Sequence, residues 1–315
     1  MRPLLAQLKA SLFLLILISG HFINAQTQSA TQELELVILG IAQDAGYPQL
    51  ACEKECCKRV FENPALAEKV VSIALYKKWE NKYFLLEATP NISKQHQFMH
   101  ENYQASLAGV FVSHAHIGHY TGLMYFGKEA ASTSKLPLYA MPRMSNFLLT
   151  NAPWEALLSN ANLELHTLRN LDRLPLGDSL FIQVFRVPHR DEYSETIGYR
   201  IEGPTKSALF IPDIDKWEAW DKDIRRLLAE VDYAFIDGTF HDGNELPGRD
   251  MSSIPHPFVV ESMAYFADLP QGGKEKIYFI HLNHTNPLLD PNSVATKKVE
   301  AAGFKVAREK MSFRL

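Results

Sequence analysis

The sequence predicts an αββα sandwich, in which two mixed β-sheets pack face to face and helices cover their outer sides. Short β-rich runs alternate with helical segments along most of the chain. Strands within 70–88 and within 179–213 follow one another without an intervening helix, which argues against a purely parallel sheet. No stretch has the composition of a linker, so the prediction is one domain over residues 33–315.

Strands in the amino-terminal half are predicted where β-branched and aromatic residues cluster. These runs are LELVILGIA (34–42), VVSIALYKK (70–78), KYFLLEA (82–88) and LAGVFVS (107–113). The carboxyl-terminal half repeats the pattern in SLFIQVFRV (179–187), TIGYRIEG (196–203), SALFIPD (207–213), VDYAFID (231–237) and KIYFIHL (276–282). Helices are predicted between several of them, over 117–127, 143–159, 216–229, 256–268 and 292–302.

Composition places the chain among ordinary globular proteins. It has 315 residues, of which 46% are hydrophobic and 22% are charged, and such a chain can bury a sizeable core. The formal charge of −4 gives no electrostatic reason to expect nucleic acid as a partner. We expect a small-molecule substrate instead.

The amino terminus has the layout of a secretory signal peptide over residues 1–25. Arg2 and Lys9 flank the start of an apolar run at 11–18, and small or polar residues lead up to Ala25. An uncleaved membrane anchor is the alternative, but the run is too short to span a bilayer comfortably. Cleavage removes two positive charges, which changes the formal charge from −4 to −6. We therefore expect an exported protein, periplasmic or secreted, without stable membrane insertion.

Three histidines in the stretch FVSHAHIGHYTGL, residues 111–123, carry the strongest chemical signal. His114 and His116 directly follow an apolar strand, and side chains two residues apart on an extended backbone point the same way. His119 completes the spacing H-x-H-x-x-H. Imidazole is a common ligand of zinc, iron and other transition metals. A lone histidine is more often structural, but three within six residues at a strand-to-helix turn predict a metal site.

Three further polar residues stand at strand ends later in the chain: His189, Asp213 and His281. Each alone has an ordinary explanation, as a loop histidine, a helix N-cap or a histidine at the edge of the core. Strand ends of a sandwich gather along one rim, so the loops that carry these residues can converge on one site.

This order of residues resembles the metallo-β-lactamase superfamily over nearly all of the mature chain. The nearest resemblance is to the pyrroloquinoline quinone biosynthesis protein B branch and to the phosphodiesterases related to it. The stretches that carry it are LGIAQDAGYPQLAC, HIGHYTGL, IPDIDKW, DGTFHDGNE, GRDM and IHLNHTNPLLD. The resemblance implies a zinc centre, with iron or manganese as alternatives. It implies a first metal on His114, His116 and His189 and a second on His119, Asp213 and His281, with Asp213 bridging the two.

Gly118 departs from this family, in which an aspartate at that position helps to bind the second metal. Loss of an anionic ligand weakens the hold on a dication. We therefore expect one tightly held catalytic metal and a second that is held weakly or only with substrate. Two equally tight metals would mean that Asp44 or His241 has taken the place of the missing aspartate. Gly118→Asp is expected to raise occupancy of the second site, unless the glycine has a positive φ that aspartate tolerates less well.

All three cysteines lie in the stretch QLACEKECCKRV: Cys52, Cys56 and Cys57. An exported protein could form a Cys52–Cys56 or a Cys52–Cys57 disulfide, whereas the adjacent Cys56 and Cys57 cannot easily pair. The resembling phosphodiesterases hold a structural zinc with three cysteines and a histidine that shortly follows the last metal-binding histidine. The resemblance thus implies His284 as a fourth ligand, although C-x3-C-C differs from the C-x-C-x2-C spacing of those proteins. We favour the structural zinc over the disulfide.

The resemblance also implies a histidine that acts as general acid in the segment after the GTF turn. This chain offers His241 and His256 there. His256 is preferred because Pro255 and Pro257 would hold it rigidly, and a role in capping or packing is the alternative.

Four charged residues are candidates for supporting roles around the metals. Glu87 and Asp44 lie at strand ends near the expected rim and are predicted to orient metal-bound histidines. Arg190 and Arg249 are candidates to neutralise an anionic substrate, with ordinary surface charge as the alternative.

Three functions are compatible with these residues. The first is an exported metal-dependent hydrolase of a phosphodiester or other ester, in which metal-activated water is the nucleophile and His256 and Asp213 are catalytic. The second is an iron-dependent oxidative enzyme like the quinone-biosynthesis protein. The third is a non-catalytic binding protein, which the number of retained ligands disfavours. Substrate specificity is expected to lie in the loops 128–180 and 241–256.

Overall fold

The computed structural model describes residues 33–315. The predicted signal peptide, residues 1–25, lies outside the described residues, so export stays a prediction. Within the part that the structure describes, no helix combines the length and the apolar character needed to cross a membrane.

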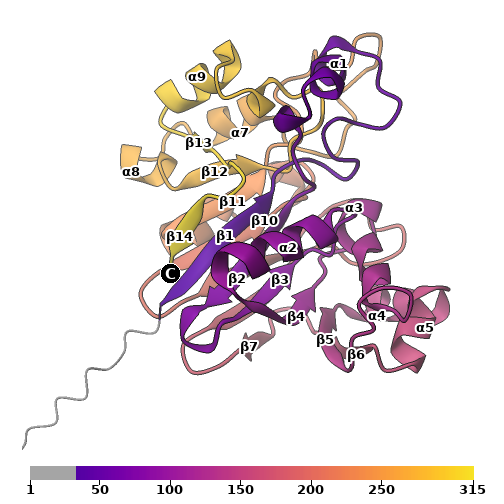
Figure 1. Ribbon diagram of the computed structural model, residues 1–315. Coiled ribbons are helices and arrows are strands. Elements are labelled where there is room, and N and C mark those ends of the chain that lie inside the picture. The colour runs from indigo at the N-terminus through magenta and orange to yellow at the C-terminus, as the bar shows by residue number, and fades with distance from the viewer. Residues whose placement is uncertain (1–32) are drawn as a thin grey trace, which may run out of the picture. The chain divides into compact units, whose positions relative to one another are not determined.

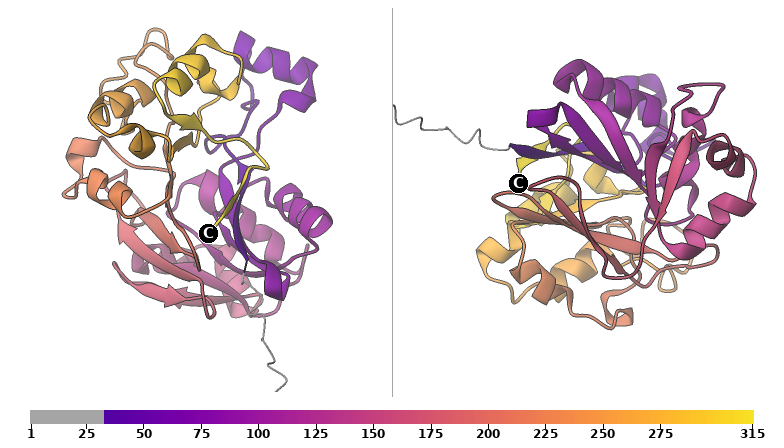
Figure 2. Two further views of the ribbon diagram at one scale, coloured as in Figure 1. Left: turned by 90° about the vertical axis from the view of Figure 1, so that its left-hand side faces the viewer. Right: turned by 90° about the horizontal axis from the view of Figure 1, so that it is seen from below.

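Two seven-stranded mixed sheets face each other with helices outside, which confirms the predicted αββα sandwich (Figures 1 and 2). The first sheet has the order β14 (Ser312–Arg314), β1 (Leu34–Gly40), β2 (Ser72–Lys77), β3 (Lys82–Leu86), β4 (Ser106–Phe111), β5 (Leu136–Ala140), β6 (Leu163–Thr167). The second has the order β13 (Lys305–Val306), β12 (Ile277–Ile280), β11 (Tyr233–Asp237), β10 (Ser207–Ile211), β9 (Ile197–Glu202), β8 (Phe181–Arg186), β7 (Arg173–Pro175). The last strand of the chain therefore pairs with the first, β14 with β1, and forms one edge of the first sheet.

Helices form the two outer layers (Figure 2). Those over the first sheet are α2 (Ile92–Tyr103), α3 (Ile117–Tyr120), α4 (Pro142–Thr150) and α5 (Trp154–Ser159). Those over the second are α6 (Ile224–Ala229), α7 (Val259–Tyr265), α8 (Gln271–Lys274) and α9 (Val294–Ala301). Helix α1 (Glu55–Glu62) lies beyond the end of β1 (Figure 1), and its Arg59 pairs with Asp290, shortly before α9, at 3.1 Å.

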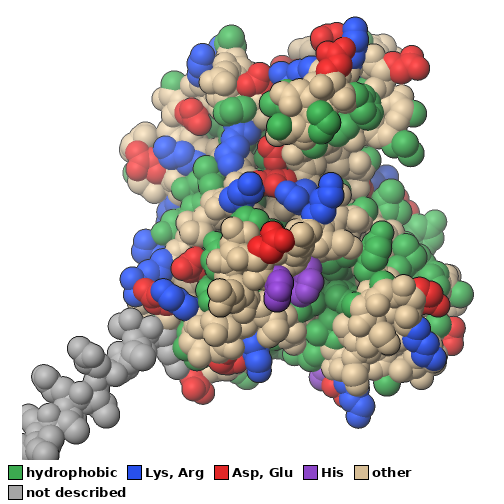
Figure 3. Space-filling view, viewed as in Figure 1, with side chains coloured by type: hydrophobic (Ala, Val, Ile, Leu, Met, Phe, Trp, Pro, Cys, Tyr) green, Lys and Arg blue, Asp and Glu red, His purple; other side chains and the backbone are tan. Residues whose placement is uncertain are grey.

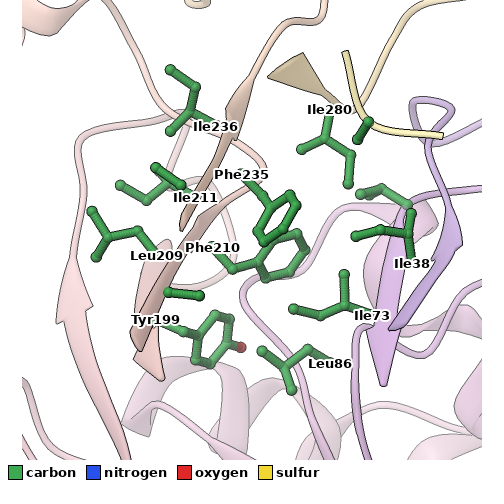
Figure 4. Close-up of a cluster of buried hydrophobic side chains, with 14 of the residues drawn as sticks. Ile38, Ile73, Leu86, Tyr199, Leu209, Phe210, Ile211, Phe235, Ile236 and Ile280 are labelled. Carbon is green, nitrogen blue, oxygen red and sulfur yellow. The ribbon is translucent and has the colours of Figure 1, made fainter. Parts of the chain in front are cut away.

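Alternation along the strands explains why both faces of the first sheet are buried. Ile38 and Ile73 point between the sheets, toward Phe210 of the second sheet (Figure 4). Val37 and Ala74, one residue away on the same strands, belong instead to the cluster under the outer helices. Burial of one large apolar side chain contributes about 1.5–3 kcal/mol, so these two cores supply the main stabilisation of the sandwich.

Some predicted helices differ from the structure in their extent. The predicted helix 143–159 is divided into α4 and α5, and Pro153 lies at the break because proline lacks the N–H that a continuous helix needs. The predicted helix 117–127 consists of α3 and a 3-10 segment, Thr121–Phe126. The segment 128–180, expected to be largely loop outside that helix, also contributes three strands: β5, β6 and β7.

A pair of carboxylates near the start of β2 makes stability sensitive to pH. Burial, together with the neighbouring carboxylate of Glu309, raises the pKa of Glu68 to about 8. The pKa in the folded state thus exceeds that in the unfolded chain. The contribution of this carboxyl to stability is therefore full below about pH 4.5 and is lost as the pH rises through 8.

We expect Glu68→Gln to remove this dependence. Each pKa unit corresponds to about 1.4 kcal/mol, so three units between pH 5 and pH 8 give about 4 kcal/mol at most. Glu68 is only partly buried, so we halve this figure and expect the variant to gain about 2 kcal/mol of unfolding free energy relative to wild type as the pH rises from 5 to 9. Urea unfolding at the two pH values measures the gain. The exposed Glu62→Gln serves as the control, and parallel pH profiles for Glu68→Gln and wild type would contradict the assignment.

Candidate metal centre

Polar side chains gather at one rim of the sandwich, where strands of both sheets end. Strands β10, β11 and β12 are parallel, and β8 runs the same way because β8 and β10 both pair antiparallel with β9. In the first sheet, β4 is parallel to β3. The loops after these strands carry the predicted ligands: His114, His116 and His119 after β4, His189 after β8, Asp213 after β10 and His281 after β12.

The first cluster consists of His114, His116 and His189, whose ligand atoms lie within 4.8 Å of one another. Nε2 of His114 is 2.8 Å from Nδ1 of His116. The rings of His114 and His189 are buried, whereas the side chain of His116 is 14% exposed and lies 3.3 Å from Glu192. The cluster therefore opens toward solvent at His116.

Both buried imidazoles of the first cluster are neutral near pH 7. Burial lowers the pKa of His189 to about 4. Burial also holds the pKa of His114 well below its usual range, and the nearby charge of His119 adds to the effect. Nδ1 of His114 lies 2.8 Å from Oγ of Ser113, which leaves Nε2 for the cluster. A neutral imidazole with a free lone pair is the form that binds a metal.

The second cluster contains His119 and His281 with two carboxylates, Asp213 and Asp44. Oδ2 of Asp213 lies 3.1 Å from Nε2 of His119 and 3.3 Å from Nε2 of His281. Oδ1 of Asp44 lies 2.9 Å and 3.5 Å from the same two nitrogen atoms. Burial opposes the charge of Asp44, but its contacts with the two histidines hold its pKa well below the usual range. Asp44 therefore faces the cluster as an anion.

Asp213 contacts both clusters. Its Oδ1 lies 3.7 Å from Nε2 of His189, while its Oδ2 faces His119 and His281. Burial would raise the pKa of Asp213, but the charges of His281 and His119 hold it well below the usual range. A single ionised carboxylate between two sets of imidazoles fits the bridging role that the resemblance implies.

Groups behind the second cluster fix the orientation of its histidines. Oγ1 of Thr239 donates to Asp237 at 2.7 Å and so accepts from Nδ1 of His281 at 2.8 Å, which directs Nε2 of His281 toward the cluster. Glu87 lies 3.3 Å from Nδ1 of His119, on the side of the ring away from the cluster. The backbones of Glu87 and His281 have positive φ values of 75° and 65°. Such strained positions in non-glycine residues concentrate at functional sites.

The clusters fit divalent metal ions. Among the described residues, Nε2 of His189, Nε2 of His281 and Oδ2 of Asp213 are buried without a hydrogen-bond partner. A buried polar atom without a partner costs about 1–3 kcal/mol, and more if it is charged. A metal ion bound by these atoms removes that cost, and imidazole with carboxylate is a donor set that suits zinc, iron and manganese.

His256 lies beside the clusters, whereas His241 does not. Nδ1 of His256 is 2.7 Å from Oδ2 of Asp237, and a ligand atom of its ring groups with those of His189 and Asp213. Burial opposes its protonation, but Asp237 raises the pKa of His256 above the usual value. His241 joins none of the ligand clusters that the described residues form. Of the two predicted general-acid candidates, His256 is thus the one that groups with the ligands, and its catalytic role stays a prediction.

The three cysteines converge on His284. Cys56 and Cys57 lie in the first turn of α1, Cys52 precedes that turn, and the four ligand atoms are within 4.8 Å of one another. No disulfide joins the three thiols. Burial raises the pKa of Cys57 to about 12, so this thiol ionises at neutral pH only beside a cation. Three cysteines and one histidine are a donor set of structural zinc sites.

The rim outside the first cluster carries charges of both signs. Arg190 lies 3.9 Å from Glu192, the carboxylate that contacts His116, so Arg190 is near the opening. Arg249 is exposed in the loop 241–256. A cavity of about 410 Å³ beside Glu192 is lined by Phe147 and Tyr193, among others. On the face drawn in Figure 3, acidic and basic side chains are interspersed rather than grouped by sign.

Known proteins share this arrangement of strands and loops. Coenzyme PQQ synthesis protein B from Methylobacterium nodulans is 24% identical to this chain, over 90% of this chain and 100% of the relative. The protein of the same name from Gluconobacter oxydans is 26% identical, over 90% and 99%. Zn(2+)-bound PqqB from Methylobacterium extorquens superposes with a TM-score of 0.75 at 23% identity, over 89% of this chain and 100% of the other.

A second solved structure has a different name. A diphosphatase from the PhnP family superposes with a TM-score of 0.63 at 18% identity, over 90% of this chain and 97% of that protein. The Beta-lactamase superfamily domain matches residues 82–282, which is more than half of the chain and includes every histidine of the two clusters. The chain therefore belongs to the β-lactamase superfamily.

Proposed function

We propose that this chain is a metal-dependent hydrolase of a phosphodiester or a related ester. The observation that carries the proposal is the first cluster, in which three histidines converge and one side remains open at His116. Three protein ligands with a free position are the arrangement of catalytic rather than structural zinc. The likeness to Zn(2+)-bound PqqB supports a zinc centre, and the likeness to a diphosphatase supports phosphate chemistry.

Each residue of the site has a separate role in the proposed hydrolysis. A bound zinc ion supplies Lewis acidity, which activates water and polarises the ester at neutral pH. Asp213 contacts both clusters and fixes their positions relative to each other. Glu87 and Thr239 keep His119 and His281 in the orientation that presents Nε2 to the centre.

His256 is placed to protonate the leaving group. Its Nδ1 is engaged by Asp237, so the proton on Nε2 is the one available to substrate. The side chain is 7% exposed and its ring centroid is 5.1 Å from that of His189, so it lies at the edge of the first cluster. Proton donation to a departing alkoxide or phenoxide accelerates hydrolysis by about 10²–10⁴-fold.

An assay of the zinc-loaded protein on aryl phosphodiesters tests this function. We expect hydrolysis of bis(p-nitrophenyl) phosphate that is lost after metal removal and restored by zinc. His256→Gln should slow release of p-nitrophenolate by about tenfold and release of unsubstituted phenolate by about a thousandfold, because only the poorer leaving group needs a proton. His241→Gln is the matched control and should leave the leaving-group dependence unchanged. Absence of diester and ester hydrolysis at every metal loading would overturn the proposal.

A second candidate is an iron-dependent oxidative reaction at the same residues. The observation in its favour is similarity to coenzyme PQQ synthesis protein B over 90% of the chain. Histidine and carboxylate ligands suit iron as well as zinc. Metal analysis of protein purified without added metal separates the two, since a zinc-filled first cluster supports hydrolysis and an iron-filled one supports oxidation.

A further inference from the structure

Gly118 and Asp44 lie against each other at the second cluster. A Cβ atom placed on Gly118 would be 2.4 Å from Cα of Asp44 and 2.6 Å from its Oδ1. The carboxylate of Asp44 therefore occupies the space into which a side chain at position 118 would project. Gly118 lies in α3, and its φ is not positive, so the absence of a side chain is required by the close approach of Asp44 rather than by a left-handed backbone.

The ring nitrogens that Asp44 faces distinguish a ligand from an orienting residue. An orienting carboxylate contacts the nitrogen of a histidine that points away from the metal. For His119 that nitrogen is Nδ1, and Glu87 lies beside it at 3.3 Å. Asp44 instead lies 2.9 Å from Nε2, the nitrogen that also faces Asp213. The predicted orienting role thus suits Glu87 and does not suit Asp44.

The carboxylate-to-histidine distances of the second cluster suit ligands of one metal, and the ligand atoms of Asp44, His119 and His281 lie within 4.8 Å of one another. Bonds of about 2.0–2.1 Å in a tetrahedron place the ligand atoms about 3.4 Å apart. The measured distances from Asp44 and Asp213 oxygens to the Nε2 atoms of His119 and His281 run from 2.9 to 3.5 Å. Asp44 is 17% exposed, whereas the side chains of the other three residues of the cluster are 0–3% exposed.

The backbone holds Asp44 next to His281 through neighbouring residues. The amide of Gln43 donates to the carbonyl of Leu282 at 2.8 Å, and the amide of Leu282 donates to the carbonyl of Ile41 at 2.7 Å. The loop after β1 is thus fastened to the loop after β12 directly beside both candidate ligands. This pairing restrains the backbone on either side of Asp44.

We infer that Asp44 is a direct ligand of the second metal and supplies, from the loop after β1, the carboxylate that position 118 lacks. The inference rests on the proposed metal centre and deepens it. It replaces the expectation of a weak second site, because the second cluster has two histidines and two carboxylates. It also reverses the expectation for Gly118→Asp, since the added side chain would collide with the backbone of Asp44.

Metal counting tests the inference without any assay of turnover. Wild type and Asp44→Asn are dialysed against zinc and analysed by inductively coupled plasma mass spectrometry, and cobalt titration then gives the affinity of each site. The substitution keeps the shape of the side chain but removes its charge. We expect the variant to bind one metal fewer per chain than wild type and to show about a hundredfold weaker second-site affinity, with the first site unchanged.

Glu192→Gln is the matched control. It removes a carboxylate that contacts His116 of the first cluster, so it should leave second-site occupancy intact. The control shows whether loss of negative charge near the centre is by itself enough to release the second metal. Asp44→Ser repeats the count if Asp44→Asn fails to fold. An unchanged metal count and affinity in a folded Asp44 variant would overturn the inference. An inactive protein with the expected counts would leave the inference standing and count against the hydrolase proposal.

Discussion

His116→Ala is expected to abolish hydrolysis and release the first metal while leaving the protein folded. Nδ1 of His116 lies 2.8 Å from Nε2 of His114, so removal of the ring deletes one of three ligands. The effect on turnover should be about a thousandfold, beyond the 10–100-fold cost typical of residues that only support a ligand. His116 is the most exposed histidine of the two clusters, so little packing is lost with its ring.

Three measurements check the His116 prediction: diester turnover, metal per chain and melting temperature. His100→Ala is the control, because His100 is exposed on α2 and belongs to neither cluster. The melting temperature of metal-free His116→Ala should match that of metal-free wild type within about 2 °C. Normal turnover by a variant shown to lack metal would remove His116 from the centre.

The sequence predicts the central strands well because their burial leaves a strong local pattern. β11 is buried at four of its five positions, and the apolar run 231–237 predicts it closely. β6 and β7 lie at the far edges of the two sheets and bury few side chains, so their sequences resemble loops. Helix α2 is not among the predicted helices, although its buried residues Ile92, Gln95 and Met99 recur at helical spacing.

The ligands of the metal centre also differ in how well the local sequence predicts them. His114, His116 and His119 are neighbours in sequence, so their spacing alone indicates a metal. The place of Asp44 depends on a contact with His119 across 75 residues, which no local spacing encodes. The pairing of a glycine at 118 with an aspartate at 44 becomes visible only when α3 and the loop after β1 are placed side by side.

The cysteine cluster and the second metal cluster share two loops. The loop after β1 carries Asp44 and then Cys52, and the loop after β12 carries His281 and then His284. Hydrogen bonds between Gln43, Ile41 and Leu282 join the two loops. A zinc ion on the cysteines and His284 would therefore restrain the two segments that carry Asp44 and His281.

Cys52→Ser is accordingly expected to lower the stability of the fold and to weaken metal binding at the second cluster more than at the first. Structural zinc contributes about 10–16 kcal/mol of binding free energy to folding. Loss of one of its four ligands is expected to remove a part of this, on the order of 4 kcal/mol, and each kcal/mol shifts the melting temperature of a large domain by about 2–4 °C. The melting temperature should therefore fall by about 10 °C.

Cys52 is partly exposed, so the substitution itself removes little packing, and the exposed Glu53→Gln serves as the control in the same loop. Metal titration should show weaker binding at the Asp44 cluster with the three-histidine cluster nearly unchanged. Two oxidised thiols in the native protein, or a melting temperature that chelators do not lower, would favour a disulfide involving Cys52 instead.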